Sequence, residues 1–131
     1  MCKIGDIIVV RGYKSQGRDI RQHSFVVLST ENGQIQGLDY DMVCNVMSSF
    51  HSEEHRKKKM GYPGNFEYSA TDEHVKNGHG KAGFIKAEQF YYFDSNKTDF
   101  YVIGNVDADL FNALLEFINS LEEVEHIIDN L

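Results

Sequence analysis

Short apolar runs alternate with polar, glycine-containing segments along most of the chain. Most of these runs are about four to eight residues long and rich in Val, Ile, Phe and Tyr, which is typical of β-strands. The run FVVLST is apolar enough to be buried on both faces. The pattern therefore predicts about six strands, in the segments 4–10, 25–30, 42–48, 65–70, 83–94 and 99–106.

The last part of the chain has the pattern of a helix instead. Apolar residues recur at three- and four-residue spacing from Leu110 to Ile128, and acidic residues occupy the opposite face. Asp107 is suited to cap the helix, and Asp109 lies in the first turn, where the helix dipole favours a negative charge. We therefore expect one helix over residues 107–129.

The segments between these elements carry loop and turn signals. Residues 11–24 are polar with two glycines, and Asn32-Gly33 is a strong signal for a tight turn. Residues 51–61 are charged throughout, so a loop or one short exposed helix fits equally well, and residues 76–83 are a glycine-rich loop. The element order predicts a mainly β fold, a small barrel or half-open sheet with the terminal helix packed across it.

Length and composition indicate a single domain over residues 1–131. The first residues, MCKIGDIIVV, do not have the pattern of a signal peptide, and no stretch approaches the roughly 18 apolar residues of a membrane span. Cys2 and Cys44 are far apart in the sequence and form no CxxC pair, so free and reduced thiols are expected. The expectation is a cytoplasmic protein without membrane contact.

The net charge of −7 is unevenly distributed. Residues 107–131 contain seven acidic residues and no Lys or Arg, so the remainder holds thirteen acidic and thirteen basic residues. The polar segment 11–24 is basic, since it has only Asp19 to balance its cations. These cations are Arg11, Lys14, Arg18 and Arg21. The overall acidity therefore says little about what the body of the chain binds.

Five segments resemble, in the same order, segments of the MazF/PemK toxin family. They are GDIIVV (5–10), the basic loop that ends in FVVLS (25–29), NVMSS (45–49), KKKMGYPGNFEY (57–68) and AEQF (87–90). Taken with the order of the predicted elements, the resemblance extends over almost the whole chain. The resemblance implies an SH3-like barrel over 1–106 with the terminal helix packed on it. It also implies a toxin that forms a homodimer and is neutralised by an antitoxin protein.

Members of that family cleave single-stranded RNA without a metal or other cofactor. The substrate's own 2′-OH is the nucleophile, and the product carries a 2′,3′-cyclic phosphate. In the family, an Arg directly before a Pro serves the phosphate and a Thr or Ser at the end of the third strand is its partner. Here His23-Ser24 replaces Arg-Pro, and Ser48 takes the hydroxyl position. A neutral imidazole binds phosphate less well than a guanidinium, but it transfers protons more readily near neutral pH.

The resemblance, together with this replacement, implies roles for individual residues. His23 is expected as general acid or base, Arg21 as phosphate anchor, and Ser48 as hydrogen-bond donor to the scissile phosphate. Neither a metal nor a cofactor is expected. The residues expected to contact the RNA substrate are Lys14, Arg18, Ser49 and Gln89.

Other interpretations stay open. Residues 51–55 (HSEEH) fit the H-x-x-E-H pattern of zinc peptidases, although their polar, lysine-rich surroundings favour a solvated surface. CcdB-type toxins, which are related in fold, bind a protein target such as DNA gyrase through the terminal helix and do no RNA chemistry. The long acidic helix and the loss of Arg-Pro favour that alternative. A decayed nuclease that only binds a partner is a third possibility.

Overall fold

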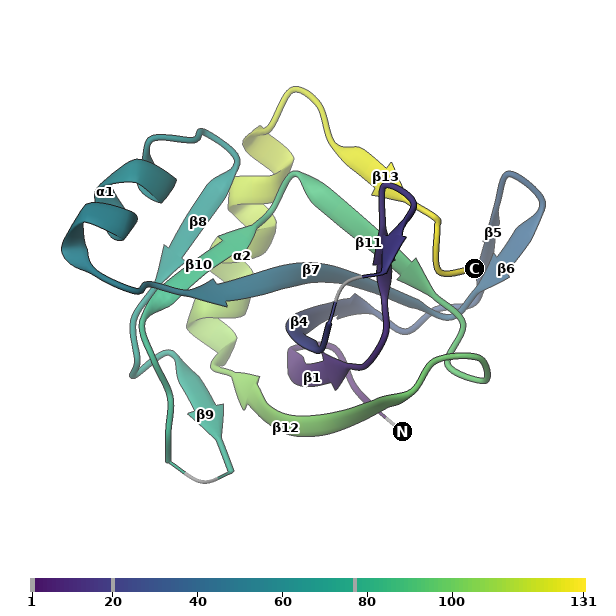
Figure 1. Cartoon of the computed structure of the whole chain (residues 1–131), viewed down its shortest axis with the longest axis horizontal. Coiled ribbons are helices and arrows are strands. Elements are labelled where there is room, and N and C mark those ends of the chain that lie inside the picture. The colour runs from purple at the N-terminus through teal and green to yellow at the C-terminus, as the bar shows by residue number, and fades with distance from the viewer. Residues whose placement is uncertain (1, 20, 77) are drawn as a thin grey trace.

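The computed structural model is mainly β and describes residues 2–19, 21–76 and 78–131, which form thirteen strands and two helices (Figure 1). Each of the six segments expected to form a strand contains a strand, but the segment 83–94 holds two, Gly83–Lys86 and Gln89–Phe93, instead of one. The strands are β1 (Asp6–Val10), β2 (Lys14–Ser15), β3 (Arg18–Asp19), β4 (His23–Ser29), β5 (Gly33–Ile35), β6 (Leu38–Tyr40), β7 (Met42–Ser49), β8 (Asn65–Tyr68), β9 (Glu73–Val75), β10 (Gly83–Lys86), β11 (Gln89–Phe93), β12 (Phe100–Val106) and β13 (Glu125–Ile127). The helices are α1 (Glu53–Met60) and α2 (Ala108–Ser120).

Nine strands form one large sheet, in the order β13-β11-β7-β4-β1-β12-β9, with β10 paired to β7 and β8 paired to β10. All of these pairs are antiparallel except the parallel pair of β11 and β13. Within the described residues, no pairing joins the two ends of this path. The observed architecture is therefore a large open sheet with a helix, not a closed barrel.

Strand β7 has two partners on one edge because the chain kinks between β10 and β11. β10 pairs with residues 47–49 of β7 and β11 pairs with residues 42–44, so residues 86–90 lie opposite Asn45 and Val46. Asn45 is fully buried, and its side-chain Nδ2 donates to the Gln89 carbonyl at 2.9 Å. This hydrogen bond replaces a ladder bond that the kink removes, because buried backbone carbonyls need a partner.

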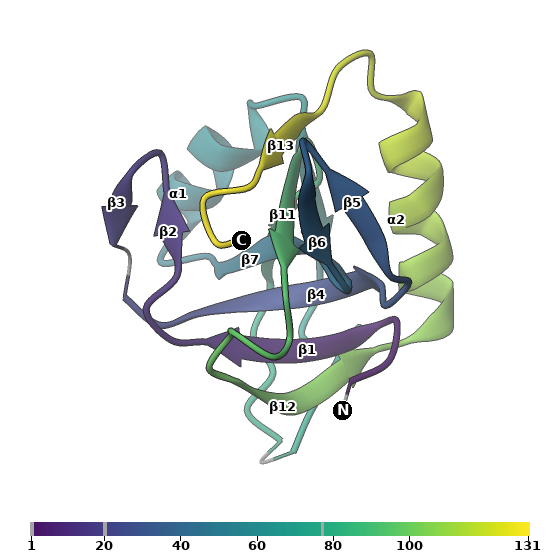
Figure 2. The ribbon, with the colours of Figure 1, turned by 90° about the vertical axis from the view of Figure 1, so that its right-hand side faces the viewer.

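Side chains from the two faces of the sheet form two apolar clusters. Adjacent residues of β4 point to opposite faces, so Phe25 lies in one cluster and Val26 in the other. Helix α2 covers the Val26 cluster with the fully buried Leu114 (Figure 2). Burying a leucine side chain contributes about 1.5–3 kcal/mol. Aromatic rings dominate the Phe25 cluster, including Tyr13, Tyr91 and Phe93.

The terminal helix is shorter than the expected span of 107–129. Its start is as expected, since Asp107 caps α2 by accepting a hydrogen bond from the Leu110 amide at 2.7 Å. Its end is different: α2 stops at Ser120, and residues 125–127 form β13 instead. Neither helix in the described part of the chain is long and apolar enough to cross a membrane.

The early end of α2 has an electrostatic and a packing cause. The last turn of α2 has no basic residue, and three glutamates follow at 122, 123 and 125, where the helix dipole disfavours negative charge. Leaving the helix lets the chain pair with the open edge of β11. It also places Ile127 in the Phe25 cluster with 4% of its surface exposed.

Two loop expectations are also corrected. The segment 11–24 contains the short β2–β3 hairpin and the first residues of β4. The tight turn lies at Gln36-Gly37, between β5 and β6, where both residues have positive φ. Gly33 is instead a strand residue packed face-on against a tyrosine, because a Cβ there would lie 2.5 Å from the Tyr40 hydroxyl. The charged segment 51–61 forms the short exposed helix α1.

Candidate active site

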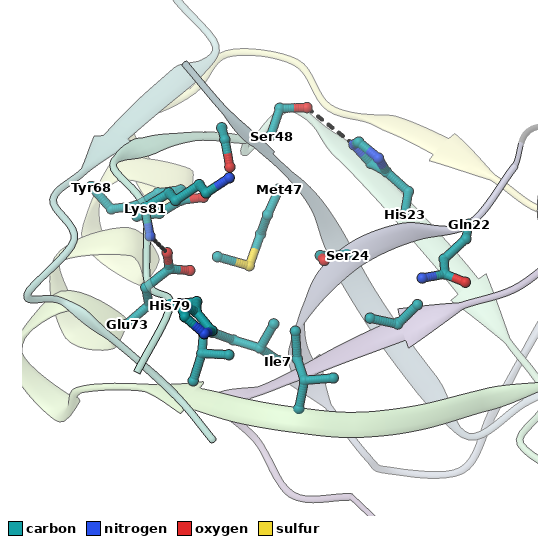
Figure 3. Close-up of a pocket in the computed structure, with 14 residues that line it drawn as sticks. Ile7, Gln22, His23, Ser24, Met47, Ser48, Tyr68, Glu73, His79 and Lys81 are labelled. Carbon is teal, nitrogen blue, oxygen red and sulfur yellow. Dashed lines mark hydrogen bonds between the residues drawn. The ribbon is translucent and has the colours of Figure 1, made fainter. Parts of the chain in front are cut away.

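Two of the residues expected in the site meet where β4 begins and β7 ends. The register pairs Ser24 with Met47, so His23 lies directly opposite Ser48 and the two side chains share a face. His23 Nε2 and Ser48 Oγ are 3.0 Å apart, within hydrogen-bond distance (Figure 3). Both side chains are half-buried. The sheet thus presents an imidazole and a hydroxyl as a contacting pair.

The surroundings of His23 favour its neutral form. Burial lowers the pKa of His23 below its ordinary value, and the positive charge of Lys86 lowers it further. At neutral pH one ring nitrogen is therefore free to accept a proton. In the tautomer that carries its proton on Nδ1, the Ser48 hydroxyl donates to Nε2. The arrangement suits a general base with a hydroxyl beside it.

A pocket of about 300 Å³ opens beside this pair toward β9. We call it the β9-side pocket. Its floor is apolar and consists of Ile7, Val9, Met47, Val75 and Ile103. Its rim is polar and includes Gln22, Ser24, Glu73, His79 and Lys81 (Figure 3). An apolar floor with a polar rim suits a flat aromatic ligand that has hydrogen-bonding edges.

A second pocket, of about 270 Å³, opens toward the β2–β3 hairpin. We call it the hairpin-side pocket. Lys86 and Gln89 reach it from the kink between β10 and β11. Tyr13 and Tyr91 form part of its wall, together with Ser15, Gln16 and Val46. His23 and Ser48 line both pockets, so the pair lies at their junction.

The C-terminal tail holds the hairpin in place beside the second pocket. The Lys14 amide donates to Asn130 Oδ1 at 2.6 Å, and Asn130 Nδ2 donates to the Lys14 carbonyl at 2.9 Å. The Gly17 amide donates to Asp129 Oδ2 at 3.0 Å. Asn130 thus imitates a backbone strand against β2, which by itself has only two residues in its ladder.

The structure separates the expected site residues into two groups. Ser49 lines the β9-side pocket and Gln89 the hairpin-side pocket, both next to His23 and Ser48. The other three expected residues are exposed and line neither pocket; they are Lys14, Arg18 and Arg21. The expected phosphate anchor Arg21 is therefore not brought to the pair, and Lys86 is the cation whose charge acts on His23.

Sequence reasoning missed Lys86 and the rim residues Glu73, His79 and Lys81. Lys86 directly precedes the AEQF segment that the family resemblance selected, and that proximity was the available signal. The glycine-rich loop at 76–83 carries no local signal for a site. Its approach to the site depends on the pairing of β9 with β12 and on the loop that follows, and neither is visible in local sequence.

The geometry does not support the zinc alternative at residues 51–55, and it does not favour thiol chemistry at Cys44. His51 and His55 are neighbours, with ring centroids 4.5 Å apart, and the His51 amide donates to His55 Nδ1 at 3.1 Å. Among residues 2–19, 21–76 and 78–131, no group of three or more His, Cys, Asp or Glu is arranged to hold a metal ion. Cys44 is fully buried, and burial raises the pKa of its thiol well above the ordinary value. A buried, protonated thiol is a poor nucleophile.

Comparison with models of known protein families finds none that matches this chain, and a search of curated proteins finds no match in sequence.

Proposed function

We propose that this protein is a metal-independent endoribonuclease that cleaves single-stranded RNA and leaves a 2′,3′-cyclic phosphate. The observation that carries the proposal is the His23–Ser48 pair, 3.0 Å apart, at the junction of two pockets. A polynucleotide has a nucleotide on each side of the cleaved phosphate. A junction between two pockets offers room for both nucleotides while the phosphate lies against the pair.

The chemistry can be assigned to three side chains. His23 Nε2 accepts the proton of the 2′-OH as the bond between the 2′-oxygen and phosphorus forms. The Ser48 hydroxyl turns to donate to a non-bridging phosphate oxygen, and the Lys86 ammonium stabilises the added negative charge. Lys86 then donates a proton to the leaving 5′-oxygen as the bond to phosphorus breaks. Neutral His23 beside cationic Lys86 provides the base and the acid that this reaction needs.

The biological setting is proposed from the resemblance to MazF/PemK toxins. In this proposal the chain is the toxin of a toxin–antitoxin pair, acts in the cytoplasm as a homodimer, and is neutralised by an antitoxin protein. The SH3-like relationship is part of the same proposal, with the open sheet as a variant of the barrel. The basic segment 11–24, beside the hairpin-side pocket, is where an antitoxin would obstruct the site.

The test is incubation of the purified protein with a long single-stranded RNA in EDTA, with the ends of the fragments identified chemically. We expect cleavage to persist in EDTA and to yield cyclic-phosphate ends. His23→Ala is expected to lower the rate by roughly 10²–10⁴ and Ser48→Ala by roughly 10²–10³. His74→Ala is the matched control, because His74 is exposed and lines neither pocket.

Intact RNA with the wild-type protein, or full activity in His23→Ala, would contradict the proposal. Intact RNA would favour the CcdB-like alternative, in which the chain binds a protein target, or a decayed nuclease. The His23–Ser48 distance also fits a nucleophile–base pair of a serine hydrolase, which is the second candidate function. An RNA with a single 2′-deoxy nucleotide at the cleavage position separates the two mechanisms. The proposed nuclease cannot cut it, because the 2′-OH is its nucleophile, whereas attack by Ser48 needs no 2′-OH.

A further inference from the structure

We propose that the β9-side pocket binds the nucleobase next to the cleaved phosphate, and that Glu73 selects a base with an exocyclic amino group over uracil. This inference rests on the proposed function and names the part of the RNA that determines where it is cut. It is carried by the shape of the pocket, by the fixed orientation of one carboxylate and by the chemistry of base edges.

The pocket has the size and polarity of a base site. Its volume is about 300 Å³, and its apolar floor includes Val9 of β1 and Met47 of β7, the two strands that flank β4. Unstacked bases in single-stranded RNA are bound by packing on protein side chains and by hydrogen bonds to their edges. Because His23 and Ser48 lie at the mouth, a base in this pocket belongs to a nucleotide that adjoins the reacting phosphate.

Glu73 is held so that one carboxylate oxygen is committed and the other is available. Glu73 is the first residue of β9, and its Oε1 accepts a hydrogen bond from the Lys81 amide. Figure 3 shows the carboxylate directed into the space between Met47 and His79. The side chain is half-buried, and burial raises the pKa of Glu73. A desolvated oxygen in such a position is stabilised by a ligand that donates a hydrogen bond.

The loop that follows β9 fixes this orientation further. A Cβ at Gly80 would lie 3.2 Å from Glu73 Cγ and 3.0 Å from the Ala70 carbonyl, so the glycine allows the loop to pack directly on Glu73. The same loop places His79 and Lys81 on the rim. The pocket therefore presents one aligned acceptor beside exposed donors, which is a pattern that distinguishes base edges.

The edges of the four bases differ in what they offer this acceptor. Cytosine, adenine and guanine each have an amino group that can donate to a carboxylate, and a carboxylate that accepts from the cytosine N4 amino group is a common pairing. The one donor on the pairing edge of uracil, N3–H, lies between two carbonyl oxygens that a carboxylate repels. Two bases flank the cut, and we expect one of these two positions to discriminate. When uracil occupies that position, wild-type protein should cleave roughly 10-fold less often than when cytosine, adenine or guanine does.

Glu73→Gln separates base selection from a purely structural role of Glu73. The amide oxygen of Gln still accepts from the Lys81 amide, so the loop keeps its anchor. The oxygen that faces the pocket becomes an NH₂ donor, which fits the uracil O4 carbonyl. We expect the preference at that position to move toward uracil by roughly 10-fold, while the overall rate changes less. Glu123→Gln, at an exposed position after α2, is the matched control.

The experiment is sequencing of all fragment ends that wild type and both variants produce from an RNA pool with randomised positions. The inference is supported if uracil is rare beside the cut among wild-type fragment ends and becomes frequent there in Glu73→Gln. Equal cleavage beside uracil and the amino-bearing bases in wild type would overturn it, and so would an unchanged preference in an active Glu73→Gln protein.

A binding measurement keeps this inference distinct from the proposed function. Non-cleavable 2′-deoxy tetranucleotides with cytosine or uracil beside the central phosphate are titrated while the NMR signals of the His79 ring are followed. We expect cytosine to shift these signals at roughly 10-fold lower concentration than uracil in wild type, and not in Glu73→Gln. Wild type that binds this way without cutting RNA refutes the nuclease alone, whereas cleavage without base discrimination refutes the base pocket alone.

Discussion

Replacing Asn130 by Ala removes the side chain that joins the C-terminal tail to the β2–β3 hairpin. The wild-type amide makes two hydrogen bonds with the backbone of Lys14, at 2.6 and 2.9 Å. Each such bond has a net value of about 1 kcal/mol, so the hairpin should lose about 2 kcal/mol of local stability. That loss corresponds to a roughly 30-fold larger population of the opened hairpin. Isolated two-stranded hairpins are marginally stable, so the hairpin depends on its contacts with the rest of the chain.

The opening can be measured by amide hydrogen exchange over residues 14–19 and by the rate of trypsin cleavage after the exposed Arg18. We expect both rates to rise by roughly 10- to 30-fold in Asn130→Ala, with little change in global unfolding by urea. Because the hairpin forms one wall of the hairpin-side pocket, the KM for RNA should rise more than kcat falls.

Asn112→Ala is the control, since Asn112 is exposed on α2, away from the tail. Exchange rates over residues 14–19 that stay within about twofold of wild type would refute the reasoning. That result would mean that the hydrogen bond from the Gly17 amide to Asp129 and the packing of Tyr13 are sufficient to keep the hairpin closed.

Two further predictions concern the base and the core. Lys86→Gln removes a positive charge that lowers the pKa of His23, so the pKa of His23 should rise toward its ordinary value. The acid limb of the pH–rate profile should therefore move to higher pH. A profile that does not move, or that moves to lower pH, would contradict this prediction. Leu114→Ala should lower the free energy of unfolding by about 2–5 kcal/mol in urea titrations, whereas Leu115→Ala, at a side chain 37% exposed, should change it by less than about 1 kcal/mol. Equal effects of the two leucine variants would contradict the packing of α2 described above.

The local pattern of the chain was sufficient to place the longer strands and the start of α2, but not the short strands β2, β3, β5, β6, β9 and β13. The strands at 6–10, 23–29 and 42–49 follow from runs of β-branched and aromatic residues, and the start of α2 follows from the cap at Asp107. The end of α2 was not predictable in this way. Apolar spacing continues past Ser120, but an open strand edge on β11 competes for the same residues.

The candidate site was predictable only in part, and only through the family resemblance. That resemblance selected His23 and Ser48, which the register of β4 and β7 brings to 3.0 Å. It also selected Arg21 for a role in which the structure brings Lys86 to the pair instead. A one-residue change in strand register would turn the side chains of a strand to the other face of the sheet. Local sequence therefore cannot show which cation lies beside His23 and Ser48.

The longer strands and the start of α2 are set locally, because propensity, periodicity and capping act over a few neighbouring residues. Which side chains meet depends instead on how the strands pair. The kink opposite Asn45 brings Lys86 close to His23. The pairing of β9 with β12 brings Glu73 to the β9-side pocket, and the C-terminal tail brings Asn130 to the β2–β3 hairpin. These contacts join residues far apart in the chain, and their energy depends on the packing of the whole sheet.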